Sequence, residues 1–262
     1  MSHVIILGAG AAPGVPSLCN GWGNCDASNP YNKRRRAGVY CNFNGTEILI
    51  DTSPDLRQQL LDNEIKKLDA VLYTHAHADH LHGIDDLREI NRINVCNLDF
   101  YATDVVLKEI KKRFSYLLSS PDKVKNVINS PSLVGYKIRC NHEFYVNDVK
   151  IMPLKQCGHN TPSNGYMFND GEVVHISDFK WLPSSTIKHL THNKVKLLIM
   201  PLTVPFGQKY HANLDEVLAY IKLINPEKVI INHMASECDY QAVIEATPEN
   251  VTAAFDNMRI EL

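Results

Sequence analysis

The residues best suited to chemistry form one dense group in the first third of the chain. Imidazole nitrogens and carboxylate oxygens suit zinc and other borderline divalent cations, and six consecutive residues here supply four such side chains: His75, His77, Asp79 and His80. Side chains alternate in an extended loop, so His75 and His77 point to the same side and can hold one ion. Asp79 and His80, where the chain turns into a helix, would face a neighbouring position. The alternative is a polar loop of solvated histidines, and the density of ligands argues against it.

Three later residues each lie just beyond a predicted strand, where loops gather at one sheet edge. They are His159, Asp178 and His233. Taken singly, each of these histidines is more often a core or surface residue than a ligand. The other histidines lack partner spacing and are given structural or surface roles: His3, His142, His175, His189 and His192. His82, close to the dense group, stays open.

The group His-Ala-His-Ala-Asp-His, after an apolar strand, resembles the signature motif of the metallo-β-lactamase superfamily. Asp51, His159, Asp178 and His233 also fall in the order of that superfamily's remaining motifs. The resemblance implies an α/β fold, a four-layer αββα sandwich with two divalent metal ions at one edge. Zn²⁺ is the expected metal, with Mn²⁺ as the alternative.

The resemblance also implies a ligand for each position. His75, His77 and His159 would hold one ion. The other ion would be held by Asp79, His80 and His233. Asp178 would bridge the two, and Asp51 would orient the histidine loop by hydrogen bonds, as supporting residues of metal sites do.

Several stretches narrow the resemblance to the phosphodiesterase branch of the superfamily, which includes the cyclic-phosphate phosphodiesterase of the carbon–phosphorus lyase pathway. They are residues 7–16, which are Gly-rich, and residues 80–88, 210–216 and 255–262. Glycines in the first stretch allow tight turns and close backbone approach. Its spacing does not match a dinucleotide fingerprint.

The implied reaction is hydrolysis of a small or cyclic phosphodiester by hydroxide generated between two metal ions, which can also stabilise the entering and leaving oxygens. Asp79 and His211 are the expected catalytic residues. His211 would protonate the leaving alkoxide or hold the phosphoryl group. The alternatives are a thioester or lactone hydrolase of the same fold and an RNA-processing nuclease.

Relatives in this branch carry a structural zinc site that this sequence has lost. Of their three cysteine positions after Gly-Val-Pro, only one is kept here, as Cys25, while Asn20 and Trp22 occupy the others. Ser236 stands in place of the histidine that completes the site. A closed zinc site needs four ligands, so we expect no third metal. The competing possibility is a shifted site built from Cys19, Cys25, Asp26 and Cys238.

The elements that position these residues can be read from periodicity and turn signals. Strands are predicted at residues 4–7, 39–43, 47–51, 70–73, 144–146, 149–154, 173–176, 197–200 and 229–231. Asn44-Gly45 predicts a hairpin turn. A helix should open at Pro54 with Ser53 as its cap, and another should span 214–224 with Asn213 as its cap. Strands interleaved with helices predict a layered α/β fold, but periodicity does not give the strand order.

The bulk composition agrees with one globular domain over residues 1–262, since no repeat, linker or composition shift divides the chain. Hydrophobic residues make up 44% and the formal charge is −2, which disfavours a general nucleic-acid or anionic-membrane binder but leaves open a local basic patch at residues 32–36. The seven cysteines fit a reducing compartment, so a cytoplasmic protein is expected. The expected partners are a small phosphodiester and, in a homodimer, a second copy of the chain; no membrane is expected, and nucleic acid is not favoured.

Overall fold

A computed structural model describes residues 1–120 and 131–262. One of its two sheets has seven strands in the order β14-β1-β2-β3-β4-β5-β6. Neighbouring strands are antiparallel from β14 to β3 and parallel from β3 to β6. The bounds are β1 (His3–Gly8), β2 (Gly38–Phe43), β3 (Thr46–Ile50), β4 (Ala70–Leu72), β5 (Leu98–Thr103), β6 (Leu133–Ile138) and β14 (Met258–Glu261).

The other sheet also has seven strands, in the order β13-β12-β11-β10-β9-β8-β7. Neighbours are parallel from β13 to β10 and antiparallel from β10 to β7. The bounds are β7 (Phe144–Val146), β8 (Val149–Lys155), β9 (Asn164–Phe168), β10 (Val173–His175), β11 (Leu197–Pro201), β12 (Lys228–Asn232) and β13 (Val251–Ala253).

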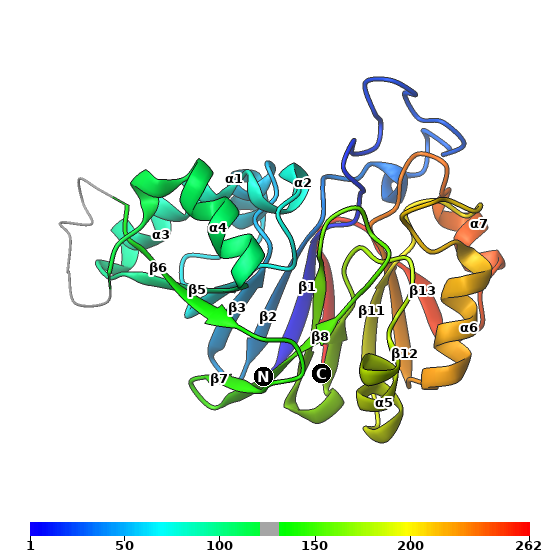
Figure 1. Cartoon of the computed structure of the whole chain (residues 1–262). Helices are drawn as coiled ribbons and strands as arrows, with labels where there is room; N and C mark the ends of the chain where they lie inside the picture. The colour runs from blue at the N-terminus through cyan, green and yellow to red at the C-terminus, as the bar shows by residue number, and fades with distance from the viewer. Residues whose placement is uncertain (121–130) are drawn as a thin grey trace.

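Helices cover the outer faces of both sheets (Figure 1). Those over the β1 sheet are α1 (Leu56–Asp62), α2 (Ala78–Leu81), α3 (Leu87–Asn94) and α4 (Asp104–Arg113). Those over the β11 sheet are α5 (Ser184–His192), α6 (Leu214–Ile224) and α7 (Tyr240–Glu245). Short 3-10 helices lie at Pro30–Asn32, Ile84–Asp86, Ser115–Leu117 and Asn169–Gly171. The two mixed sheets with flanking helices confirm the four-layer α/β architecture predicted from the sequence.

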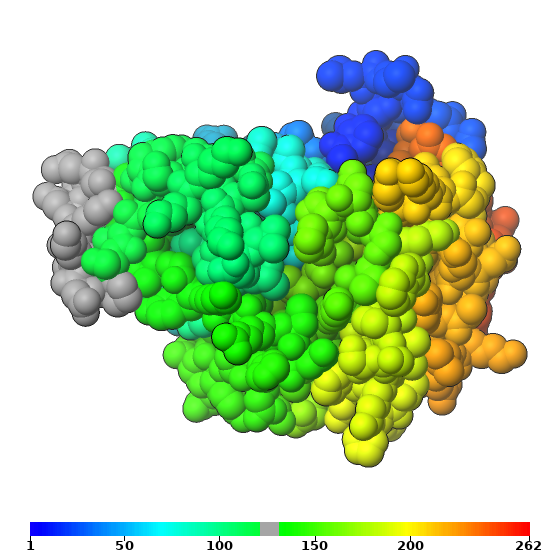
Figure 2. All heavy atoms as spheres, viewed as in Figure 1, coloured from blue at the N-terminus to red at the C-terminus, as the bar shows by residue number. Residues whose placement is uncertain are grey.

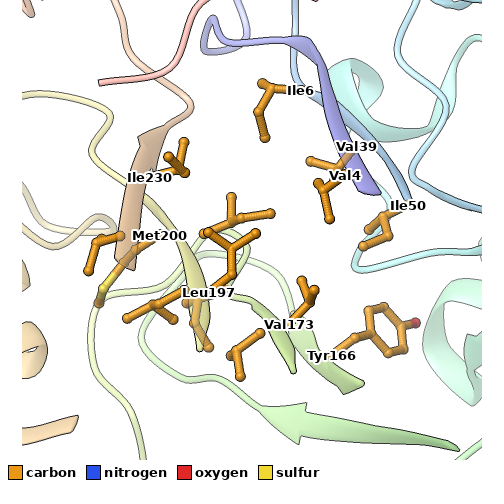
Figure 3. Close-up of a cluster of buried hydrophobic side chains, with 14 of the residues drawn as sticks. Val4, Ile6, Val39, Ile50, Tyr166, Val173, Leu197, Met200 and Ile230 are labelled. Atoms are coloured by element: carbon orange, nitrogen blue, oxygen red, sulfur yellow. The ribbon is translucent and has the colours of Figure 1, made fainter. Parts of the chain in front are cut away.

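Two apolar cores explain the layering. The larger core lies between the sheets, where Val4, Ile6 and Val39 face Leu197 and Ile230 (Figure 3). The smaller core joins the β1 sheet to its helices. β5 serves both because its side chains alternate: Leu98, Phe100 and Ala102 are buried in the smaller core, while Tyr101 packs against the larger one. Most of these apolar side chains are fully buried, which is the main favourable contribution to folding.

Most of the local predictions are confirmed. Asn44 and Gly45 have positive φ angles of 52° and 100° and join β2 to β3, as a type I′ hairpin requires. Asn213 caps α6 in a reciprocal capping box with Glu216. The predicted start of the first helix is wrong by two residues: α1 begins at Leu56.

The reason for that shift lies in competing hydrogen bonds. The Ser53 hydroxyl accepts a bond from the Asp55 amide and donates one to Gln59 Oε1. Asp55 then occupies the cap position, but its carboxylate binds Arg36 rather than the helix.

In the described part of the chain, no helix is long and apolar enough to cross a membrane.

Candidate metal centre

The predicted site residues lie in loops that leave one edge of the sandwich. Asp51 follows β3, the histidine loop follows β4, His159 follows β8, Asp178 follows β10 and His233 follows β12. These five strands run in the same sense within their sheets. Their carboxyl ends therefore meet at a common edge, where functional groups of open α/β sheets gather.

The structure brings all seven predicted ligands together in two groups, within each of which the ligand atoms lie no more than 4.8 Å apart. One group contains His75, His77, His159 and Asp178. The other contains Asp79, His80 and His233. In the described residues no further group of this kind is found.

In the first group, the nitrogens of three imidazoles converge. His77 Nδ1 lies 3.1 Å from His75 Nε2 and 3.1 Å from His159 Nε2. Asp178 Oδ2 lies 3.8 Å from each of those two Nε2 atoms. Three nitrogens and one oxygen at such spacing match a tetrahedral divalent site.

The second group is equally compact. His80 Nε2 lies 3.2 Å from Asp79 Oδ2 and 3.3 Å from His233 Nε2, and Asp79 Oδ2 lies 3.3 Å from His233 Nε2. His80 Nε2 also lies 3.8 Å from Asp178 Oδ2. The same carboxylate oxygen is thus equally distant from nitrogens of both groups, which is the position that a bridging ligand would take.

Hydrogen bonds behind the ligands determine which nitrogen each ring presents. Asp51 Oδ2 accepts from His80 Nδ1 at 2.7 Å and from the Thr74 hydroxyl at 2.6 Å, while Thr74 Oγ1 lies 3.0 Å from His75 Nδ1. These partners favour the proton on both Nδ1 atoms, so that each Nε2 atom would present its lone pair to a bound metal ion. His159 is held in the same way, because its Nδ1 faces the Tyr210 carbonyl at 3.3 Å.

Thr203, just after β11, is a supporting residue that the sequence analysis missed. Its hydroxyl oxygen lies 3.2 Å from His233 Nδ1 and 3.1 Å from His211 Nδ1. A hydroxyl has a single proton, so it accepts from one ring and donates to the other. If His233 Nε2 is a ligand, its Nδ1 donates to Thr203. Thr203 then donates to His211 Nδ1, and the His211 proton must be on Nε2.

His211 lies over the two groups. Its ring centroid lies 4.9 Å from the centroid of the His159 ring. The His211 ring is stacked on the His233 ring, with the centroids 6.4 Å apart. Burial lowers the pKa of His211 to about 4. Two interactions hold the loop that carries His211. The Ala212 amide donates to the Phe179 carbonyl, and the Glu216 carboxylate accepts from Lys180 Nζ at 2.7 Å.

The donor set fits divalent metal ions. Burial lowers the pKa of His75 well below its ordinary value and lowers that of His77, so both rings are neutral, the form that binds metal. Burial alone would raise the pKa of Asp178, but the neighbouring imidazoles lower it by a larger amount. The carboxylate therefore stays ionised.

Backbone details place His159 and the histidine loop. Gly158 has φ +79°, and a Cβ there would lie 2.5 Å from Lys180 Cβ; only glycine fits this position. Arg113, at the end of α4, donates from Nη2 at 2.8 Å to the carbonyl of Ala76, which lies between His75 and His77. His82, left open by the sequence, contacts Arg113 Nη1 at 3.1 Å and belongs to neither ligand group.

Arg34 lies beside Cys25 and Cys238, two of the residues that a shifted zinc site would use. Its side chain is buried, and its guanidinium donates to the Cys238 carbonyl at 2.8 Å and to Asn32 Oδ1 at 2.8 Å. Cys25 Sγ lies 4.0 Å from the same guanidinium. Burial raises the pKa of both thiols, that of Cys238 to about 12. Among the described residues these two cysteines belong to no group of potential metal ligands, and hydrogen bonds from Arg34 hold this loop.

The neighbouring arginines do not form a free basic patch. Arg35 Nη2 lies 2.6 Å from Asp62 Oδ2, and Arg36 makes two bonds to the Asp55 carboxylate at 2.8 and 2.7 Å. The loop before them projects from the molecule, with Leu18 fully exposed (Figure 2).

A cleft of about 370 Å³ opens over the two ligand groups. Ala11, Ala12 and Pro13 of the Gly-rich loop line one wall. The backbone of that loop packs closely against residue 35. A Cβ on Gly10 would lie 2.7 Å from the Arg35 carbonyl oxygen, which is the close backbone approach expected of these glycines. Other residues that line the cleft include Ser17, Asn20, Asp79, Asp178, Val204, His211, Ala235, Ser236 and Glu237.

Relatives of known name share parts of this sequence and fold. A Porphyromonas gingivalis protein named octanoyltransferase is 32% identical over 260 residues, which cover 97% of this chain and 50% of the relative; the chain thus spans about half of that protein's length. A crystal structure of a diphosphatase from the PhnP family superimposes with a TM-score of 0.86 at 25% identity, covering 100% of this chain and 98% of that one. Zinc-bound PqqB from Methylobacterium extorquens superimposes with a TM-score of 0.75 at 20% identity, covering 99% of this chain and 100% of that one.

The family assignment rests on most of the chain. Residues 46–234 match the family described as the beta-lactamase superfamily domain. That range contains every residue of the two ligand groups. This chain belongs to the beta-lactamase superfamily domain family and has the metallo-β-lactamase fold.

Proposed function

We propose that the protein is a phosphodiesterase that hydrolyses a small or cyclic phosphodiester with two divalent ions, Zn²⁺ or Mn²⁺. The observation that carries the proposal is the position of Asp178 Oδ2, 3.8 Å from imidazole nitrogens of both ligand groups. Two divalent ions about 3.5–4 Å apart activate water and stabilise both oxygens of an in-line phosphoryl displacement. The likeness to the PhnP-family diphosphatase supports the phosphodiesterase branch.

The residues of the chain would hold the two ions and supply a proton donor. Asp79, His80 and His233 hold one position, and His75, His77 and His159 hold the other, with Asp178 between them. His211 presents an Nε2 proton to the cleft because Thr203 binds its Nδ1. That proton can be donated to a phosphoryl oxygen or to the departing alkoxide, and either bond stabilises charge that develops during cleavage.

The charge of the cleft favours a small substrate. Among its lining residues in the described part of the chain there is no lysine or arginine, and Glu237 adds a negative charge near Ser17, Asn20 and Ser236. A nucleic acid needs several cationic contacts along its phosphates. A cleft of about 370 Å³ instead suits a single diester whose leaving group carries hydroxyl groups.

The test is a substrate panel with metal-loaded protein. Bis(p-nitrophenyl) phosphate and a 2′,3′-cyclic nucleotide should be hydrolysed, and hydrolysis should stop after chelation and return with Zn²⁺ or Mn²⁺. Single-stranded RNA should bind weakly and without metal-dependent cleavage. Turnover of acyl substrates alone would overturn the proposal.

A second function, hydrolysis of an acyl thioester, is favoured by two observations. The relative named octanoyltransferase matches this chain over half of its length. The cleft also has an apolar part, formed by Ala11, Val204 and Ala235, which pack together. An octanoyl thioester therefore belongs in the same panel, and preference for it over the phosphodiesters would select this second function.

A further inference from the structure

A small cavity lies beside the metal centre, lined by residues of both sheets. It is lined from one sheet by Asp51 and His80 and from the other by His175, Asp178 and Asn232. The space open to the centre of a water molecule is about 10 Å³, close to the smallest that holds one water. The cavity therefore has room for one molecule of the size of water.

Three residues that line it each have a polar atom with no hydrogen-bond partner in the described part of the chain. His175 Nδ1, Asp178 Oδ1 and Asn232 Oδ1 are buried and have no hydrogen bond to any described residue. The three residues are only 7%, 2% and 3% exposed. Buried polar atoms are nearly always paired with protein or with ordered water. Three such atoms around one cavity indicate a shared partner inside it.

The chemistry of the three atoms matches a water molecule. His175 Nδ1 can carry a proton in the neutral ring and always carries one in the protonated ring, so it can act as a donor. The set then consists of one donor and two acceptors. Water offers two protons and two lone pairs and usually makes about three hydrogen bonds in such sites. A cation would suit the two oxygens but not an N–H donor.

We propose that this cavity binds one structural water molecule, which donates to Asp178 Oδ1 and Asn232 Oδ1 and accepts from His175 Nδ1. Among the described residues Asp178 Oδ1 has no hydrogen-bond donor: His233 Nδ1 is 3.4 Å away but is bonded to Thr203. The water therefore fixes the plane of the carboxylate whose Oδ2 faces both ligand groups. His175 and Asn232 act as positioning residues for the metal centre.

The positions of these two residues in the sequence support this role. His175 ends β10, three residues before Asp178, and Asn232 ends β12, directly before His233. The cavity thus joins the strand ends that deliver a ligand of each group. Partners behind the ligands typically change metal affinity by about 10- to 100-fold when they are removed.

Two experiments test the proposal, and neither depends on the substrate. A high-resolution crystal structure of the metal-loaded protein should show one water within hydrogen-bond distance of all three atoms. Chelator-stripped protein titrated calorimetrically with Zn²⁺ should give about 10- to 100-fold weaker binding of at least one ion in His175→Phe, a variant of similar volume without a donor. His175→Asn, whose amide can replace Nδ1–H, should recover most of that affinity.

Thr186→Val is the matched control, because it also replaces a buried hydrogen-bonding group but lies away from the cavity, bonded to the Lys155 carbonyl; its metal affinities should equal those of the wild type. A metal ion or empty space in the cavity would overturn the proposal. So would equal losses of affinity in His175→Phe and His175→Asn. If His175→Phe fails to fold, the crystal structure of the wild type still decides.

Discussion

Replacing Thr203 with valine tests how the metal centre is coupled to the residue above it. Thr203 Oγ1 lies 3.2 Å from His233 Nδ1 and 3.1 Å from His211 Nδ1. Valine has nearly the same shape but can neither donate nor accept. Both rings would lose the partner that determines which nitrogen carries the proton. His233 would bind its ion less well, and His211 would present Nε2–H less often.

The size of the effect follows from the two lost bonds. A typical intramolecular hydrogen bond contributes about 0.5–1.5 kcal/mol net, so two bonds amount to about 1–3 kcal/mol. Since about 1.4 kcal/mol corresponds to a factor of ten, the combined loss in kcat/KM should be roughly 5- to 150-fold. A change confined to His233 would weaken metal binding, whereas a change confined to His211 would lower kcat at saturating metal.

Steady-state kinetics on bis(p-nitrophenyl) phosphate at several Zn²⁺ concentrations separates these two contributions. Thr203→Ser, which keeps the hydroxyl, should remain close to the wild type. The reasoning is refuted if Thr203→Val retains wild-type kinetics and metal affinity, or if Thr203→Ser is impaired to the same extent. The thermal unfolding of all three proteins, measured without metal, checks that the fold is intact.

Other changes test the remaining assignments. Asp178→Ala should lower the metal content toward one ion per chain and abolish turnover, and elemental analysis showing two tightly bound ions would contradict a bridging role. His211→Ala should keep both ions but slow hydrolysis by about 10²- to 10⁴-fold if it is a general acid; the loss should shrink with a p-nitrophenolate leaving group, and equal losses for activated and unactivated diesters would leave only phosphate binding. Protein purified without added zinc should contain two ions per chain, and a third tight ion that Cys25→Ser removes would contradict the hydrogen-bonded role of Arg34.

The sequence by itself determined the features that depend on local spacing. The alternation of strands and helices predicts the layered α/β fold, because apolar strands between helices must be buried from both sides. Asn44-Gly45 and Asn213 with Glu216 signal a turn and a helix start by chemistry that acts within a few residues. The four ligands of the histidine loop are visible for the same reason. The later ligands are isolated in the sequence, and only the resemblance to the superfamily linked them to this loop.

Tertiary structure decided everything that depends on contacts between distant segments. The strand order, and the pairing of β14 with β1, follow from packing that periodicity does not record. Thr203 gave no signal in the sequence, because a lone threonine after a strand is common, and its role exists only because two histidines approach it from different loops. His175 was assigned a structural role, and its unpaired nitrogen becomes meaningful only beside Asp178 and Asn232. A hydrogen-bond network is a property of three-dimensional proximity, and in this protein its members are contributed by both sheets.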